Sequence, residues 1–87
     1  MHTHGDPTYL VCSSSADESR QWAKQYAPDR EHIHVTDART LRGLRGPHIV
    51  VVMDSFEDRP ASSRSAIADR IRGLKEQGLI HGILRVR

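Results

Sequence analysis

The sequence predicts a single α/β domain with a small, open, mostly parallel four-stranded sheet and helices on both faces. Short apolar segments alternate with amphipathic segments along the 87 residues, and this alternation is typical of α/β proteins. Residues 49–53, IVVVM, are apolar at successive positions, which is typical of a central parallel strand covered on both sides. Right-handed crossovers between the strands then favour the strand order 2-1-3-4.

Seven elements are expected after a short tail. Residues 1–7 are polar and are predicted to be that tail, and residues 8–87 form the domain. The elements are a strand at residues 9–12, a helix at 16–27, a strand at 32–36, a short helix at 38–45, a strand at 48–53, a helix from 62 or 63 to 77, and a strand at 83–87. The first helix is expected on one face of the sheet, and the other two helices on the opposite face.

Capping residues and helix breakers set the expected boundaries in the first half of the chain. Ser15 and Glu18 have the spacing of a capping box at the start of the first helix, and Pro28 ends that helix. Asp37 is suited to cap the short helix. Gly46, followed by proline, ends it.

The longest helix is expected in the second half of the chain. Residues 56–60 are predicted to form a loop, and Ser62 or Ser63 to cap the helix that follows. Apolar side chains then recur at helical spacing, which predicts a buried stripe. Gly78 is expected directly after the helix end, where a left-handed conformation is common.

Apolar and basic side chains alternate in the last strand. Leu84 and Val86 are expected to face the long helix, and Arg85 and Arg87 the thinly covered opposite face. The direction of this strand is left open, because residues 80–82 also allow a tight reversal. Since an incompletely covered face and exposed edges favour association, we expect a homodimer or a complex with another protein.

Composition excludes several classes of protein. The longest apolar run, residues 49–53, is far too short to cross a bilayer. Residues 1–7 contain no basic start followed by an apolar core, so neither membrane insertion nor secretion is expected. Cys12, the single cysteine, cannot form an internal disulfide. A cytoplasmic location is therefore expected.

Charge is distributed unevenly behind a formal net charge of +2. Residues 1–37 contain three basic and six acidic side chains, whereas residues 38–87 contain ten basic and five acidic ones. Eleven of the thirteen basic residues are arginines. An excess of arginine over lysine suits bidentate contacts with phosphate or carboxylate groups, although a genome rich in G and C also explains it. The first part of the chain is therefore acidic and the second part basic, but this distribution does not indicate which ligand the protein binds.

Serine and acidic side chains mark the candidate ligand site. In open parallel sheets, ligands bind beyond the carboxyl ends of the strands, where the strand order reverses. Here that point lies between the first and third strands, and an anion there would be favoured by the adjacent helix N-terminus. The alternative is that the serines and the aspartate only cap a helix and a turn. The candidate residues are Ser13, Ser14, Ser15, Asp54 and Ser55.

Arginines suggest a second candidate surface, for nucleic acid. Arg39, Arg42 and Arg45 recur every three residues and are expected to form one stripe on the short helix. Other basic side chains of the second half of the chain would join them in contacting phosphates: Arg59, Arg64, Arg70, Arg72, Lys75, Arg85 and Arg87. The alternative is a solvated surface of mixed charge, because acidic residues are interleaved and aromatic side chains for base stacking are scarce.

Catalysis, metal binding and cofactor binding have little support in the sequence. Neither the phosphate-binding pattern GxxxxGK[ST] nor the dinucleotide pattern GxGxxG occurs, although Asp37 occupies the position of an acidic ribose contact. His32 and His34 would share one strand face but would supply only two of the ligands that zinc needs. Cys12 is expected to be buried and inert. We therefore expect no catalytic residue, metal or cofactor.

Residues 41–54, LRGLRGPHIVVVMD, resemble the Walker B region of P-loop motors, in which an apolar strand ends in an aspartate. Because no Walker A sequence is present, the resemblance does not imply ATP hydrolysis. The chain as a whole resembles small Rossmann-like α/β proteins of actinobacterial phages with no assigned activity. That resemblance rests on the Arg-rich composition, the strand, serine and helix opening at residues 10–16, and residues 41–46 with the strand after them.

The function that these observations favour is that of a non-catalytic accessory or interaction protein. It would be phage-derived, would act in the host cytoplasm, and would bind itself or a host protein. The alternative is a module that binds nucleic acid or nucleotide phosphates through residues 13–15 and the arginine stripe.

Overall fold

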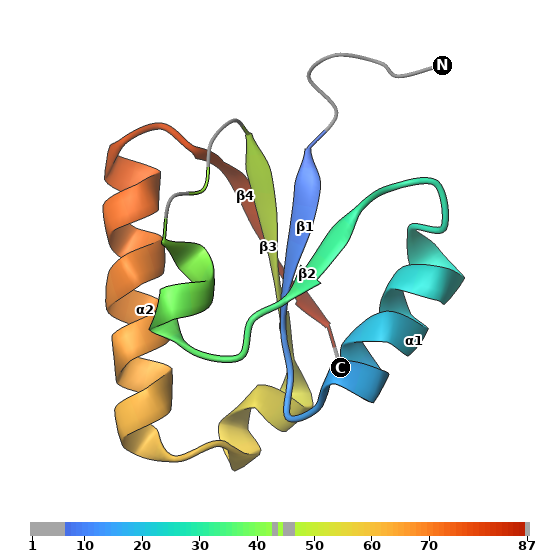
Figure 1. Cartoon of the computed structure of the whole chain (residues 1–87), viewed down its shortest axis with the longest axis horizontal. Coiled ribbons are helices and arrows are strands. Elements are labelled where there is room, and N and C mark those ends of the chain that lie inside the picture. The colour runs from blue at the N-terminus through green and yellow to red at the C-terminus, as the bar shows by residue number, and fades with distance from the viewer. Residues whose placement is uncertain (1–6, 43, 45–46, 87) are drawn as a thin grey trace.

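The computed structural model describes residues 7–42, 44 and 47–86. Its four strands form one sheet in the order β2-β1-β3-β4, and every neighbouring pair is parallel (Figure 1). The predicted Rossmann-like α/β fold and strand order are confirmed, and the last strand is parallel. The elements are β1 (Thr8–Cys12), α1 (Ala16–Tyr26), β2 (His32–His34), η1 (Ala38–Leu41), β3 (His48–Met53), η2 (Asp54–Asp58), α2 (Ala61–Glu76) and β4 (Ile80–Val86).

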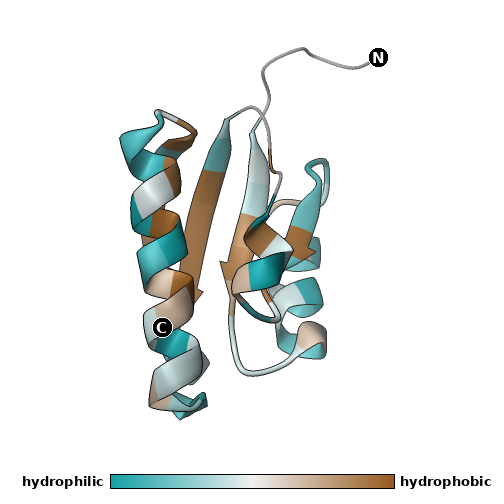
Figure 2. Cartoon of the chain, turned by 60° about the vertical axis from the view of Figure 1, so that its left-hand side comes forward, coloured by the Kyte–Doolittle hydropathy of each residue, from teal (hydrophilic) through white to brown (hydrophobic). Residues whose placement is uncertain are grey.

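Two separate groups of apolar side chains pack on the two faces of the sheet. One face carries α2 and η1, where Leu10 and Val50 are buried together with Leu41 and Ile67. The other face carries α1, which packs Trp22 and neighbouring alanines on Val11 and Val51. Successive residues of β1 and β3 thus face opposite layers, as expected for central strands. Figure 2 shows this arrangement, with hydrophobic strands between helices that carry hydrophilic outer surfaces.

Helix α1 begins as predicted but uses only half of the expected capping box. The Ser15 side chain accepts a hydrogen bond from the backbone N–H of Glu18 (3.2 Å). The Glu18 carboxylate does not return to the backbone of Ser15; it accepts from the hydroxyl of Ser55 instead. The side chain that was expected to close the helix end therefore connects it to the segment after β3.

Both short segments between strands and helices differ from the prediction. Asp37 caps η1 through the N–H groups of Arg39 and Thr40, but this element is a single turn of 3-10 helix. It ends because Arg42 is extended. The predicted loop at 56–60 is largely the 3-10 helix η2.

The start of α2 also differs from the prediction that Ser62 or Ser63 caps it. The N-cap residue is Pro60, and the serines lie inside the first turn. Proline lacks a backbone N–H and has a fixed φ, so it suits the start of a helix although its side chain makes no capping hydrogen bond. The carbonyl of Pro60 still accepts from the N–H of Arg64 (3.0 Å).

The side chains of β4 lie on the opposite faces of the sheet from those predicted. Arg85 lies on the α2 side with Ile83, whereas Val86 packs with Trp22 on the α1 side. The cause is an irregular register: His48 pairs with Ile80, but the next residue of β3 pairs with Gly82. One extra residue in β4 inverts every later side chain. Leu84 therefore lies on the α1 side, and Arg87 is outside the described residues.

The C-terminus of α2 ends in the predicted turn. Gly78 has a positive φ of 79°, and its N–H donates to the carbonyl of Lys75, while the N–H of Leu79 donates to that of Leu74 (both 3.0 Å). These two bonds define a Schellman motif. The turn directs Leu79 onto the core beneath α2.

Two glycines in this region predict opposite effects of the same substitution. Gly78→Ala should lower the free energy of unfolding by about 1 kcal/mol, because a side chain disfavours the left-handed conformation. Gly73→Ala, inside α2 with open space around it, should raise it by about 0.5–1 kcal/mol. Urea denaturation of both variants tests this. Shifts of the same sign would contradict the assignment of the helix end.

Candidate functional site

The structure brings the predicted site residues together at the carboxyl ends of β1 and β3. The backbone N–H of Ser14 donates to the hydroxyl oxygen of Ser55 (3.1 Å), and the Ser55 hydroxyl donates to Glu18. Asp54 begins η2 and is exposed. These contacts join residues that are far apart in sequence, so the residues at the ends of β1 and β3 are neighbours in the fold.

Two backbone donors near the start of α1, where the sequence predicts an anion site, already have partners. The N–H of Ser14 bonds to Ser55 and that of Glu18 to Ser15, and two carboxylates, Asp17 and Glu18, lie in the first turn of α1. Negative charge at a helix N-terminus is already favourable to the helix, and it repels a further anion. Anion binding by residues 13–15 stays a prediction, and the geometry favours the alternative in which these groups close the edge of the sheet.

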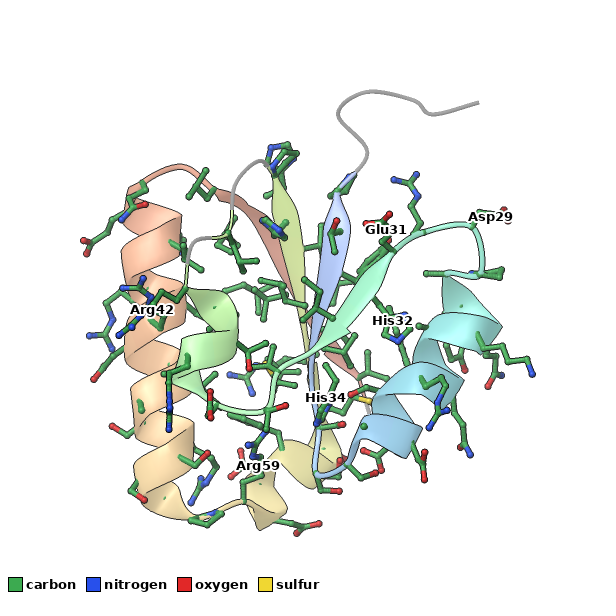
Figure 3. All side chains as sticks on the ribbon, in the orientation of Figure 1. Asp29, Glu31, His32, His34, Arg42 and Arg59 are labelled. Atoms are coloured by element: carbon green, nitrogen blue, oxygen red, sulfur yellow. The ribbon has the colours of Figure 1, made fainter. Side chains whose placement is uncertain are left out.

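Arg59 is the residue at this edge that sequence reasoning did not single out. Its guanidinium donates to the carbonyl oxygens of Val35 (2.6 Å) and Ser13 (3.4 Å), and also to that of Thr36 (Figure 3). It also lies over the ring of Phe56, 6.0 Å from the centroid. The planar fork of an arginine suits several acceptors at once. Arg59 thus ties the chain leaving β1 to the chain leaving β2.

A directed chain of hydrogen bonds runs beside it, from β2 through α1 to the end of β1. The Ser13 hydroxyl donates to the Ser15 carbonyl (2.7 Å), which can only accept. Ser13 has no second proton, so Ser19 must donate in their 2.7 Å contact. Ser19 has then used its own proton, and His34 must donate from Nδ1 (2.7 Å). The network therefore assigns the proton of neutral His34, which is labelled in Figure 3, to Nδ1.

Two titratable groups beside Arg59 are held in their neutral forms. Burial lowers the pKa of His34, and the positive charge of Arg59 and the neighbouring His32 lower it further. Burial raises the pKa of Cys12 to about 11, against the opposing effect of Arg59. The buried thiol is thus protonated at neutral pH.

The arginines of the second candidate surface are not all in one place. Arg39 and Arg42 line a hollow of about 120 Å³ together with Arg70 from α2. Because η1 is a single turn, Arg42 follows it rather than belonging to it, and Arg45 lies outside the described residues. Arg85 is on β4. The described residues therefore do not form the predicted helical stripe. Arg39 and Arg42 instead share a hollow with Arg70 of α2.

Neither a metal site nor a membrane-spanning helix is found among the described residues. Among them, no group of three or more His, Cys, Asp or Glu side chains is arranged to hold a metal ion. Within the same residues, no helix is long and apolar enough to span a membrane. No protein-family model, curated protein or solved structure matches the chain.

Arg59→Gln tests the role of the guanidinium at the sheet edge. We expect the free energy of unfolding to fall by about 2 kcal/mol, because charged hydrogen bonds to the segments that follow β1 and β2 are lost. Arg72→Gln is the control, since Arg72 makes only an exposed contact of 3.6 Å with Asp69 and should change stability by less than about 0.5 kcal/mol. Equal effects of the two substitutions in chemical denaturation would contradict the assigned role.

The pH dependence of stability tests the environment of His34. Its pKa is lowered in the folded state, so in the pH interval around the ordinary histidine pKa of about 6.5 the unfolded chain takes up more protons at this position. Its contribution to stability is therefore complete above the ordinary histidine pKa and declines as the pH falls through it. His34→Asn should lose less stability than the wild type over this interval, as measured by denaturation at several pH values. An identical decline in both proteins would show that His34 is not the group responsible.

Proposed function

We propose that the chain is a non-catalytic interaction protein whose partner is a second copy of itself, joined through the outer edge of β4. The observation that carries this proposal is the exposure of Ile83 and Leu84, which are 46% and 45% exposed in the middle of that strand. Large apolar side chains at such exposure on an edge strand favour association with another chain.

The two edges of the sheet differ in their capacity to add a strand. β4 has seven residues and lies at the end of the strand order, so backbone groups on its outer side lack a neighbouring strand. β2, at the opposite end, has three residues and begins with an exposed histidine. A seven-residue edge supports a continuous ladder with a second chain, whereas a three-residue edge supports little.

The α1 side of the sheet supports the same conclusion. Helix α1 covers Val11 and Val51, while Leu84, further along the sheet, remains partly uncovered. Figure 1 shows α1 and α2 on opposite sides of the sheet, and α1 packs beside β2. A second copy beside β4 would cover Leu84 without displacing either helix.

A two-fold antiparallel pairing centred on Leu84 fits the sequence of the strand. It would place Leu84 opposite Leu84, Gly82 opposite Val86, and Ile83 opposite Arg85, each pair on one face. No arginine would then face its own copy across the axis. The extra residue near His48 and Ile80 lies outside the paired segment.

The arrangement of potential nucleophiles supports a role without catalysis. His34 donates a proton toward Ser19, and Ser19 donates toward Ser13, which is opposite to the direction in which a histidine base activates a serine. The raised pKa of Cys12 likewise keeps its thiol protonated. A phage-encoded protein that acts in a host cytoplasm is compatible with such a buried, reduced cysteine.

Binding of nucleic acid or nucleotide phosphates is the second candidate function. The hollow lined by Arg39, Arg42 and Arg70 favours it, because three arginines from two parts of the chain line the same hollow. It ranks below self-association because exposed arginines on flexible side chains are common on surfaces of mixed charge.

Self-association predicts a mass that depends on concentration. In sedimentation velocity, the wild type should move from the chain mass of 9.8 kDa toward twice that value as its concentration rises. Leu84→Lys should weaken the dimer by about tenfold or more, which is about 1.4 kcal/mol, because a charge replaces an apolar contact at the axis.

Ala66→Lys is the matched control, since Ala66 is also exposed but lies on α2. It should associate like the wild type. A wild type that stays at the chain mass at every concentration would overturn the proposal, and so would equal association of both variants.

A further inference from the structure

A cavity of about 330 Å³ lies on the α2 side of the sheet, between that helix and strands β3 and β4. Its walls are mainly apolar: Val50 and Val52 come from β3, Ile67 and Ile71 from α2, and Ile83 from β4. The cavity opens to solvent. Its size is at the lower end of the range found for small-molecule sites.

Basic side chains lie at the rim of this cavity. Arg72 and Lys75 come from α2 and Arg85 from β4, and the acidic lining residue is Glu57. The carboxylate of Glu57 is already paired with Arg64 at 3.0 Å. The rim therefore has an excess of positive charge above an apolar floor.

We propose that this cavity binds a small amphiphilic anion, with an apolar body against the β3 and β4 side chains and a carboxylate or phosphate head at the basic rim. An apolar body gains from leaving water, since the lining is hydrophobic. The arginine forks at the rim suit either oxyanion. Because Arg72 has only a long, exposed contact with Asp69 (3.6 Å), little is lost when it turns to a ligand.

The local sequence explains why the space exists. Protein interiors are normally close-packed, and few voids exceed the size of a water molecule. Helix α2 rests on the core through Ile67 and Leu74, but Ala68, which lines the cavity between them, carries a single methyl group. Ile83, on the opposite wall, is nearly half exposed.

This inference goes beyond the proposed self-association and is tested without disturbing it. Ile83 and Arg85 belong both to the cavity wall and to β4, so neither is altered in the experiment. The substitutions are confined to α2, whose cavity-lining residues are on the other wall. A failure of dimer formation therefore leaves the result for the cavity interpretable.

Calorimetric titration of the wild type with butanoate, hexanoate and octanoate is the first test. Binding should strengthen by about fourfold for each added methylene until the cavity is full. Octyl phosphate distinguishes a phosphate head from a carboxylate, and octanol lacks the charge. Octanol should bind about tenfold more weakly than octanoate. No binding of octanoate or octyl phosphate, or equal binding of octanol, would overturn the proposal.

Two pairs of variants place the site. Ala68→Leu fills the cavity and should reduce octanoate affinity by about tenfold or more, whereas Ala66→Leu, outside its lining, should bind like the wild type. Arg72→Gln combined with Lys75→Gln should weaken the binding of octanoate but not that of octanol. Arg20→Gln combined with Lys24→Gln, on α1 and outside the cavity lining, is the control for charge. These positions are exposed, and circular dichroism verifies that each variant folds. Equal affinities within either pair would contradict the assigned location.

Discussion

Coverage of a parallel sheet on both faces is the constraint on which this structure depends. Such a sheet has two apolar faces, and each must be buried. The chain meets this need at the centre, where Leu10 and Val50 face α2 and η1 while Val11 and Val51 face α1. One helix covers the α1 side, and that helix has eleven residues. The uncovered remainder falls on β4, at the end of the sheet.

Hydrogen bonds at the carboxyl edge of the sheet join neighbouring segments of the chain. Related architectures use that edge to bind ligands, but here Arg59 bonds to the carbonyl oxygens of Ser13 and Val35, and Ser55 joins Ser14 to Glu18. The backbone N–H of Ser14 and the guanidinium of Arg59 are donors suited to an anion, but here they bond to neighbouring segments of the chain. This explains why the strongest candidates for recognition lie elsewhere, at the outer edge of β4 and in the cavity beneath α2.

The sequence predicted the sheet well because its signals are local and strong. The apolar run at 49–53 identified a central strand, and Gly78 marked a helix end that has the expected positive φ. The facing of β4 could not be predicted, because a single extra residue in its pairing reverses the alternation and leaves no mark in composition. Arg59 was equally hidden among thirteen basic residues, since its three acceptors are backbone atoms distant in sequence.

Amide hydrogen exchange of β4 at low and high protein concentration tests the central claim most directly. Alternate amides of an edge strand point away from its neighbour, and in a lone chain they exchange rapidly. If a second copy pairs with β4, the outward amides of the segment around Leu84 become protected as the concentration rises, while those of β2 do not change. Rapid exchange of the outward β4 amides under conditions where the mass has doubled would contradict the account, because association would then use another surface.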